Sequence, residues 1–492
     1  MENVDTVETQ INIETEKRAV NEITASDELP VHLTELYDKN ISPEERRLFK
    51  SLLLKYQDAF SKDSKDIGTT NLVEHTIDTG DARPIRIPPR RIPLAKIKQA
   101  EDEIKEMADG GIIEPCHGPW SFPVVLIPKP KDNSIRFCID YRRLNDSHPL
   151  PRIDDTLDAL SGAKLFSVLD LKSAYWNVKI ARKDIAKTAF SIPGSGLWQF
   201  NKMSFGLCNA PATFVRLMEQ VLRGLNWKIC LVYLDDIIVF SKTFKEHLEY
   251  LNQVLDCLKR ANLKLSPQKR DLFKDRVVFL GHVVSADGTT TDPAKIESVT
   301  NWPIPKNVRQ VRSFIGLCSY YRRYVRNFAD IARPLHKLTE KNVKFEWTDS
   351  CQESFDTLKR ALTTAPILGY PTCEDKFIID CDASNDGMGG ILSQVQNGTE
   401  KVICYFSKAF TKPECRYCVT RRALLAVVAS IRHFHHYLYG RHFLVRSDHG
   451  ALRWLFKFKN PEGQIARWLE TLATYDFNIE HRAGRIYSNA DA

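Results

Sequence analysis

Two runs of apolar and β-branched residues, 229–232 and 237–240, enclose the tetrapeptide Tyr233-Leu234-Asp235-Asp236. Such runs predict paired strands, so we expect the acidic tetrapeptide at the tip of a β-hairpin. Adjacent aspartates repel each other there, and a divalent cation that prefers hard oxygen ligands, Mg²⁺ or Mn²⁺, would relieve the repulsion. Taken alone, an ordinary acidic turn explains the tetrapeptide equally well.

A second strand-like run, residues 166–170, ends in Asp170. If this strand lies beside the hairpin, then Asp170, Asp235 and Asp236 converge. Three carboxylates can hold two metal ions, which activate an attacking hydroxyl and stabilise a leaving pyrophosphate in nucleotidyl transfer. The pattern therefore predicts the polymerisation of nucleotides.

The charge distribution favours a nucleic-acid partner. The chain has 492 residues and a formal net charge of +8, with −7 in residues 1–40 and +15 in the remainder. A basic body of this kind suits phosphate backbones, although scattered lysines also serve solubility. The 12 cysteines show no regular spacing, and no signal peptide or long apolar span occurs. We therefore expect a soluble, multidomain, intracellular protein that does not enter membranes.

Several segments have readable local patterns. Residues 1–45 predict a flexible acidic leader, and the four prolines of residues 83–93 predict an extended basic arm. Residues 94–107 have helical spacing and end before Gly110-Gly111, whereas residues 122–132 and 135–143 predict two strands and a turn.

Basic side chains flank that turn. Lys129 and Arg136 could reach a triphosphate there, although solvated surface charge is the simpler explanation for an isolated hairpin. Further on, a loop enters a helix at residues 212–222. We expect residues 307–328 to form one helix. Its arginines and aromatics would suit the backbone of a nucleic-acid duplex; alternatively, its aromatics form part of the protein core.

Four motifs in order resemble the reverse transcriptase of gypsy-type LTR retrotransposons, the Metaviridae. They are LDLKSAYW, FNKMSFGLCNAPATF, YLDDIIVFS and FLGHVVS, and the resemblance covers residues 80–492. It implies an α+β, mixed α/β multidomain fold: a right-hand polymerase with fingers, palm and thumb, followed by a connection and an RNase H-like domain. The implied divisions are a leader at 1–45, fingers and palm at 46–285, thumb at 286–340, connection at 341–375, and RNase H-like domain at 376–492.

The resemblance also assigns roles to residues. Asp170, Asp235 and Asp236 match the catalytic triad, which binds two Mg²⁺ ions or Mn²⁺ in their place, and Lys129 with Arg136 matches the triphosphate-binding pair. Tyr175 matches the aromatic that excludes a ribose 2′-hydroxyl, although a core aromatic would look the same in sequence. Phe205 and Gly206 match the loop that contacts the nascent base pair. Asn177 and Ser204 depart from the Gln and Pro that relatives often have.

A second set of carboxylates lies in the last third of the chain. Strand-like runs end in Asp382 and Asp448, and His481 and Asp491 follow, so a second two-metal site that cuts phosphodiesters is predicted. These residues match three acids and the histidine of the family's RNase H domain. The fourth acid, a glutamate, is replaced by Ala423, and we therefore expect a weakened Mg²⁺ site and RNase H activity that is absent or severely reduced.

The implied partners are an RNA template, a DNA primer, their RNA–DNA hybrid and dNTPs. The family's assemblies include a homodimer, and its setting is the cytoplasm, within a virus-like particle, or the nucleus. We expect the chain to be a piece of a larger polyprotein. Two other classes remain open: a domesticated, non-catalytic nucleic-acid-binding protein, and an RNA-synthesising relative, which would favour a small residue over Tyr175.

Overall fold

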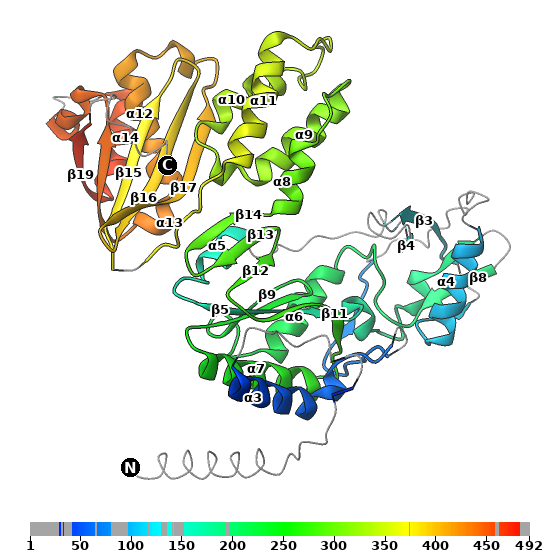
Figure 1. Ribbon diagram of the computed structural model, residues 1–492. Helices are drawn as coiled ribbons and strands as arrows, with labels where there is room; N and C mark the ends of the chain where they lie inside the picture. The colour runs from blue at the N-terminus through cyan, green and yellow to red at the C-terminus, as the bar shows by residue number, and fades with distance from the viewer. Residues whose placement is uncertain are drawn as a thin grey trace. The chain divides into compact units, whose positions relative to one another are not determined.

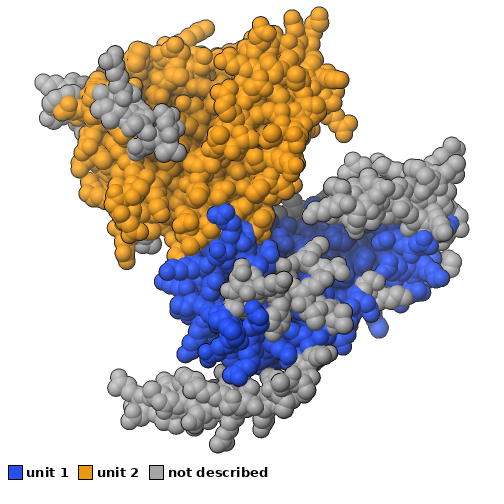
Figure 2. Space-filling model, viewed as in Figure 1, with its two compact units in different colours: residues 1–156, 163–277 blue, residues 157–162, 278–492 orange. Residues whose placement is uncertain are grey.

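The computed structural model describes residues 29–30, 33, 42–63, 66–79, 97–116, 119–128, 135–139, 141, 152–192, 196–372, 374–457 and 462–482. The chain forms two compact units, residues 1–156 with 163–277 and residues 157–162 with 278–492 (Figure 2). The predictions for the basic arm at 83–93 and for nearly all of the acidic leader lie outside the described residues. The predicted domain boundaries stay predictions.

The centre of the first unit is a four-stranded sheet with the order β11-β5-β10-β9 (Figure 1). Its strands are β5 (Leu165–Leu171), β9 (Cys230–Tyr233), β10 (Asp236–Ser241) and β11 (Leu265–Lys274). The antiparallel β9–β10 pair places Tyr233 opposite Asp236, and Leu234 adopts a left-handed φ of 55° in the turn. The predicted hairpin with an acidic tip is confirmed.

Helix α7 (Phe244–Arg260) packs on this sheet and begins at a capping box. The Thr243 side chain accepts a hydrogen bond from the Glu246 backbone, and the Glu246 side chain accepts one from the Thr243 backbone, so free N–H groups of the first turn are satisfied. His247 is fully buried between the helix and the sheet, where its ring nitrogens are hydrogen-bonded to the hydroxyls of Ser167 (2.7 Å) and Ser241 (2.8 Å). The imidazole therefore ties β5, β10 and α7 together.

A second sheet of this unit has the order β2-β8-β7-β3-β4. Its strands are β2 (Ile113–Pro115), β3 (Phe122–Pro128), β4 (Ile135–Ile139), β7 (Phe190–Ile192) and β8 (Gly196–Phe200). Strands β3 and β4 pair antiparallel, which confirms the two predicted strands; the turn between them is outside the described residues.

The predicted helix before this sheet is α4 (Ile97–Asp109). It ends where the glycine pair predicts, because Gly111 takes a φ of 64° and the Ile112 N–H then reaches back to the Met107 carbonyl (2.9 Å). Helix α6 (Ala210–Val221) begins two residues before the predicted 212, since Pro211 fits its first turn. The other elements are α3 (Pro43–Lys55), η1 (Gln57–Ala59), β1 (Glu74–His75), α5 (Ile153–Asp158), η3 (Ala174–Asn177), β6 (Lys179–Ile180) and η4 (Ile185–Thr188).

The second unit opens with a three-stranded sheet and a group of helices. These elements are β12 (Arg276–Phe279), β13 (His282–Ser285), β14 (Gly288–Thr291), α8 (Pro293–Thr300), α9 (Val308–Tyr320), η5 (Arg322–Tyr324), α10 (Phe328–Lys337) and α11 (Asp349–Thr363). They bury their own apolar cluster, which includes Phe314, Tyr324 and Phe355.

The single helix predicted at 307–328 is wrong. Helix α9 ends at Tyr320, a short 3₁₀ turn follows, and Asn327 takes a left-handed φ of 53° before α10 begins. Tertiary bonds outweigh helix propensity here, because the Tyr321 hydroxyl donates to the Gly281 carbonyl (2.6 Å) and Arg322 donates to the Ser407 carbonyl (2.5 Å).

The structural explanation of this segment's aromatics holds for Phe314, Tyr321, Tyr324 and Phe328, which are buried.

A five-stranded sheet with the order β17-β16-β15-β18-β19 completes the unit. Its strands are β15 (Phe377–Ala383), β16 (Gly387–Gln396), β17 (Thr399–Ala409), β18 (His442–Ser447) and β19 (Asp476–His481). The accompanying helices are η6 (Glu414–Arg416), α12 (Val419–His433), α13 (His435–Leu438), η7 (Gly450–Lys457) and α14 (Gly463–Ala473). Strands β15, β18 and β19 run parallel to one another.

Both faces of this sheet are covered. Phe406 of β17 stacks on His433 of α12, with 4.4 Å between ring centroids, whereas the hydroxyl of the next residue, Ser407, accepts from the Ala329 N–H of α10. Successive strand residues point to opposite faces, so α12 and α10 lie on opposite sides of the sheet, as Figure 1 shows. Gly387 permits this close approach, since a Cβ there would lie 2.2 Å from Asp330 Oδ1.

Within the described residues, no helix combines the length and apolar character that a membrane span requires.

Burial lowers the pKa of His247 to about 3, from an ordinary value of 6.5. The unfolded chain therefore binds the extra proton between pH 6.5 and pH 3, and this contribution to stability is lost as the pH falls, by about 1.4 kcal/mol per pH unit. We expect the destabilisation caused by His247→Gln, measured by urea unfolding, to shrink by about 2 kcal/mol between pH 7 and pH 5. A destabilisation independent of pH would show that His247 is not held neutral.

Candidate active sites

The two acidic strands of the first unit meet in one register. Asp170 of β5 lies directly opposite Asp236 of β10, and the Leu171 N–H donates to the Asp235 carbonyl (3.4 Å). Directly opposed residues of an antiparallel pair have their Cβ atoms about 5 Å apart on the same face. The structure thus brings together Asp170 and Asp236, with Asp235 next along the chain.

These residues suit a hard divalent cation, because all of their side-chain donors are carboxylate oxygens. Among the described residues, no group of three or more His, Cys, Asp or Glu side chains is closed around a common point as in a bound metal centre. The donor type and the strand register are the two features of this position that fit a divalent cation.

Tyr175 lies beside this carboxylate group, on η3 just after β5. Its ring packs against Phe205 (5.1 Å between centroids) and edge-on against Phe214 of α6 (5.8 Å). Burial raises the pKa of the Tyr175 hydroxyl to about 12, and the nearby charge of Asp235 adds to the shift. The hydroxyl is therefore protonated at neutral pH, and the predicted nucleotide-binding residues Tyr175 and Phe205 are in contact.

Gly206 follows Phe205 and cannot be replaced without strain. Its φ is 102°, and an added Cβ would lie 2.4 Å from the Ile139 carbonyl oxygen of β4. The loop therefore passes tightly over the end of β4, and Gly206 itself is solvent-exposed. Of the predicted triphosphate pair, Lys129 lies outside the described residues, and Arg136 is paired with Ile127 across β3 and β4.

The second predicted site lies at the carboxyl ends of the parallel strands β15, β18 and β19. Cys381 pairs with Ser447, so Asp382 and Asp448 follow at the same level of neighbouring strands, and both are exposed. His481 of β19 pairs with Ser447, and its Nε2 donates to the Asp448 carbonyl (3.0 Å). The structure brings these three together, whereas Asp491 lies outside the described residues.

Ala423 lies on the first turns of α12, which adjoin the same strand ends. Arg422 donates to the Ser384 carbonyl (3.3 Å) just beyond β15, and Thr420 is hydrogen-bonded to His449 (2.9 Å) just beyond β18. Ala423 directly follows these two anchor residues on α12, is buried and carries no carboxylate. Position 423 thus adjoins the ends of the strands that present Asp382 and Asp448.

A buried ion-pair network lies directly behind these strand ends. Arg446 donates to both oxygens of Asp380 (2.8 and 2.5 Å) and also pairs with Glu400, while Arg482 lies 3.7 Å from Asp380. Asp380 is 7% exposed and Arg446 12%. Asp380 and Arg446 each precede a predicted catalytic aspartate by two residues, so the network joins the strands that carry Asp382 and Asp448.

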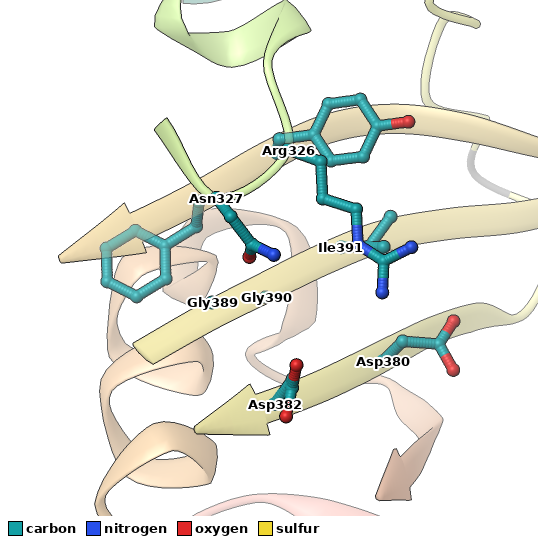
Figure 3. Close-up of a pocket in the computed structure, with 9 residues that line it drawn as sticks. Arg326, Asn327, Asp380, Asp382, Gly389, Gly390 and Ile391 are labelled. Atoms are coloured by element: carbon teal, nitrogen blue, oxygen red, sulfur yellow. The ribbon is translucent and has the colours of Figure 1, made fainter. Parts of the chain in front are cut away.

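A small pocket lies on the same face of the sheet. Figure 3 shows Asp380 and Asp382 on β15, Gly389 and Gly390 on β16, and Arg326 reaching over them from the segment before α10. The sequence placed Arg326 on a face suited to a duplex backbone; the structure places it in the pocket with Asp382.

Sequence reasoning missed the ion-pair network and the place of Arg326. One signal was present: Asp380 and Asp382 alternate along an apolar strand, as do Arg446 and Asp448. Alternation of this kind puts the two charges of each strand on one face. The partners Glu400 and Arg482 carry no comparable signal, because they come from distant parts of the chain.

Family models match two parts of the chain. Residues 127–284 match "Reverse transcriptase (RNA-dependent DNA polymerase)", and residues 347–445 match "RNase H-like domain found in reverse transcriptase". The chain is 38% identical over 466 residues to the retrovirus-related Pol polyprotein from transposon 297 and 33% identical over 487 residues to that from transposon gypsy, both from Drosophila melanogaster.

The chain is a relative of the gypsy-type Pol polyproteins, with a reverse transcriptase domain and an RNase H-like domain. The two matches cover 92% and 94% of this chain but 43% and 46% of the relatives, so the chain spans less than half the length of these curated relatives. The family prediction is confirmed.

Solved structures share the fold of this chain. A foamy viral protease-reverse transcriptase (dRH) in complex with double-stranded DNA matches with a TM-score of 0.82 at 24% identity, covering 94% of this chain and 83% of that chain. The foamy viral enzyme in complex with an RNA/DNA hybrid matches with a TM-score of 0.77 at 24% identity, covering 94% and 64%. The predicted multidomain α and β fold is confirmed.

We expect Arg446→Met to lower the unfolding free energy of the second unit by about 3 kcal/mol, because it removes the bidentate cationic partner of the buried Asp380 and leaves only Arg482, 3.7 Å away, as an ion-pair partner for this carboxylate. Chemical denaturation measures this change. The matched control is Arg432→Met, which removes an exposed arginine bonded to Thr471 and should change stability by less than about 0.5 kcal/mol. Equal effects of the two substitutions would show that the network does not stabilise the sheet.

Proposed function

We propose that this chain is an RNA- and DNA-directed DNA polymerase whose C-terminal RNase H-like domain has lost its nuclease activity or retains little of it. The observation that carries the proposal is the register of β5 and β10, which sets Asp170 opposite Asp236, close to the ring of Tyr175. The reverse transcriptase match over residues 127–284 supports it.

Asp170, Asp235 and Asp236 would hold the divalent cations. Two Mg²⁺ ions at such a site supply charge neutralisation for the attacking 3′-hydroxyl and the leaving pyrophosphate. The protein residues orient the partners: the sheet fixes the carboxylates, the protonated Tyr175 packs below the incoming sugar, and Phe205 with Gly206 supports the nascent base pair. Lys129 and Arg136 are the proposed partners of the triphosphate.

Nucleic-acid partners follow from the same comparisons. The foamy viral enzymes of similar fold are described with double-stranded DNA and with an RNA/DNA hybrid. We infer that an RNA template, a DNA primer and the hybrid that they form are the substrates of this chain, together with dNTPs. The net charge of +8 suits such partners.

The RNase H-like domain keeps Asp382, Asp448 and His481 at neighbouring strand ends. Without a carboxylate at position 423, a two-metal site would lack one oxygen ligand, and the attacking water would be poorly held. The domain would then serve to bind the hybrid. A non-catalytic nucleic-acid-binding protein remains the second candidate, and the primer-extension test below separates the two.

Primer extension on an RNA template with Mg²⁺ and dNTPs tests the polymerase proposal. We expect the wild-type chain to extend the primer, and Asp236→Asn to reduce extension to background while the hybrid still binds. Asp448→Asn is the matched control and should leave extension unchanged. Binding of the hybrid without extension by the wild-type chain would instead favour the non-catalytic protein.

Tyr175→Ala should lower the preference for dNTPs over ribonucleotides at least about tenfold, or about 1.4 kcal/mol, because removing the ring makes room for a 2′-hydroxyl. Single-nucleotide incorporation kinetics with each substrate class measure the ratio of kcat/KM values. An unchanged ratio would mean that Tyr175 is only a core aromatic.

Ala423→Glu should create cleavage of the RNA strand of a hybrid, because it adds a carboxylate beside the strand ends that carry Asp382 and Asp448. An end-labelled RNA annealed to DNA reports cleavage, and Ala423→Gln, similar in size but uncharged, is the control. Efficient cleavage by the wild-type chain would contradict the proposed loss of activity.

A further inference from the structure

We propose that Asn177 is a positioning residue for substrate selection: its side-chain amide holds the turn that carries Tyr175, and so sets the depth at which the Tyr175 ring meets the sugar of an incoming nucleotide. This inference rests on the proposed function, because it concerns the same polymerase site. It goes beyond that function by naming a residue that touches neither the substrate nor the metal ions.

The contacts of Asn177 are concentrated on one turn. Its Nδ2 group donates to the carbonyls of Lys172 (2.9 Å), Ser173 (3.2 Å) and Ala174 (3.2 Å). Three consecutive carbonyls therefore point at one amide nitrogen. Asn177 is fully buried, so water does not compete for its side-chain amide.

That turn needs such a clamp because its backbone is strained. Ser173 has a left-handed φ of 46° and ψ of 53°, a conformation that residues with a Cβ adopt at a cost. The turn leads from the end of β5, where Asp170 lies, to η3, where Tyr175 lies. The amide of Asn177 therefore stabilises the bend between β5 and η3. This bend determines where the Tyr175 ring lies relative to Asp170.

Asn177 is itself fixed from the opposite side. Its backbone carbonyl accepts from the Thr70 N–H (2.8 Å), and the bare backbone of Gly68 packs against its side chain, since a Cβ at Gly68 would lie 2.6 Å from Asn177 Oδ1. The backbone of residues 68–70 thus packs against Asn177, and the Asn177 amide stabilises residues 172–174.

The ring of Tyr175 is closely packed on two sides. Tyr175 lies between Phe205 and Phe214, at 5.1 and 5.8 Å between ring centroids, and its carbonyl accepts from the Val178 N–H (3.1 Å). Movement of the turn at 172–174 would therefore shift Tyr175 relative to Phe205 without disturbing the strand pairing of Asp170 and Asp236. A displaced turn should therefore weaken the discrimination against ribonucleotides more than it lowers the rate of DNA synthesis.

Asn177→Asp tests this inference most sharply, because it keeps the shape of the side chain and replaces the donor nitrogen with an oxygen that faces three carbonyl oxygens. We expect the ratio of kcat/KM for a dNTP to that for the matching ribonucleotide to fall at least about fivefold. Affinity for the primer–template should be unchanged. A loss of folded protein alone would lower both kcat/KM values equally and leave their ratio unchanged.

Asn252→Asp is the matched control. Asn252 of α7 uses its Oδ1 as an acceptor, from Lys55 Nζ (2.9 Å) and the Tyr56 hydroxyl (3.0 Å), and an aspartate keeps both bonds. The same chemical change should therefore leave the ratio unaltered. Should Asn177→Asp not fold, Asn177→Ser retains one donor and should give a smaller fall in the ratio.

The outcomes separate this inference from the proposed function. If Tyr175→Ala lowers the ratio but folded Asn177→Asp or Asn177→Ser does not, the positioning role of Asn177 is overturned while the selection by Tyr175 stands. If Tyr175→Ala itself has no effect, the proposed role of Tyr175 fails first. A fall in the ratio for both Tyr175→Ala and the Asn177 variants, without one for Asn252→Asp, supports the inference.

Discussion

The pairing of β5 with β10 is the constraint on which the proposed polymerase site depends. A shift of one residue would move Asp170 away from Asp236 and turn it to the other face of the sheet. The buried His247 of α7 stabilises this register, because its ring is hydrogen-bonded to a serine of each strand. The packing of α7 on the sheet therefore keeps two carboxylates close together although they repel each other.

In the second unit, an ion pair joins the strands that lead to the carboxylates. Asp382 and Asp448 lie at the ends of neighbouring parallel strands, and Asp380 and Arg446, two residues earlier on each strand, form the ion pair. The arrangement still lacks a carboxylate at position 423, where α12 adjoins both strand ends. The proposed nuclease site thus has Asp382 and Asp448 at neighbouring strand ends and lacks the carboxylate that the family resemblance implies at position 423.

The sequence predicted those features that depend on short-range patterns. The acidic hairpin followed from two apolar runs around Asp235 and Asp236, and the end of α4 followed from Gly110-Gly111. The helix expected at 307–328 failed because hydrogen bonds from Tyr321 and Arg322 to distant carbonyls break it. The roles of Glu400, Arg482 and Arg326 were equally out of reach, since each depends on a contact between residues far apart in the chain. Asn177 departs from the family pattern in the sequence, but the three carbonyls that its side chain binds are evident only in the structure.

We propose that Asp170 and Asp236, set opposite each other by the sheet, hold the divalent cations for DNA synthesis. Titration of Mn²⁺, followed by electron paramagnetic resonance, tests it on the chain bound to a dideoxy-terminated primer, an RNA template and the next dNTP. We expect about two tightly held Mn²⁺ ions per complex. These ions should be lost in Asp236→Asn and retained in Asp448→Asn. The same number of tightly held ions in wild type and Asp236→Asn would contradict it.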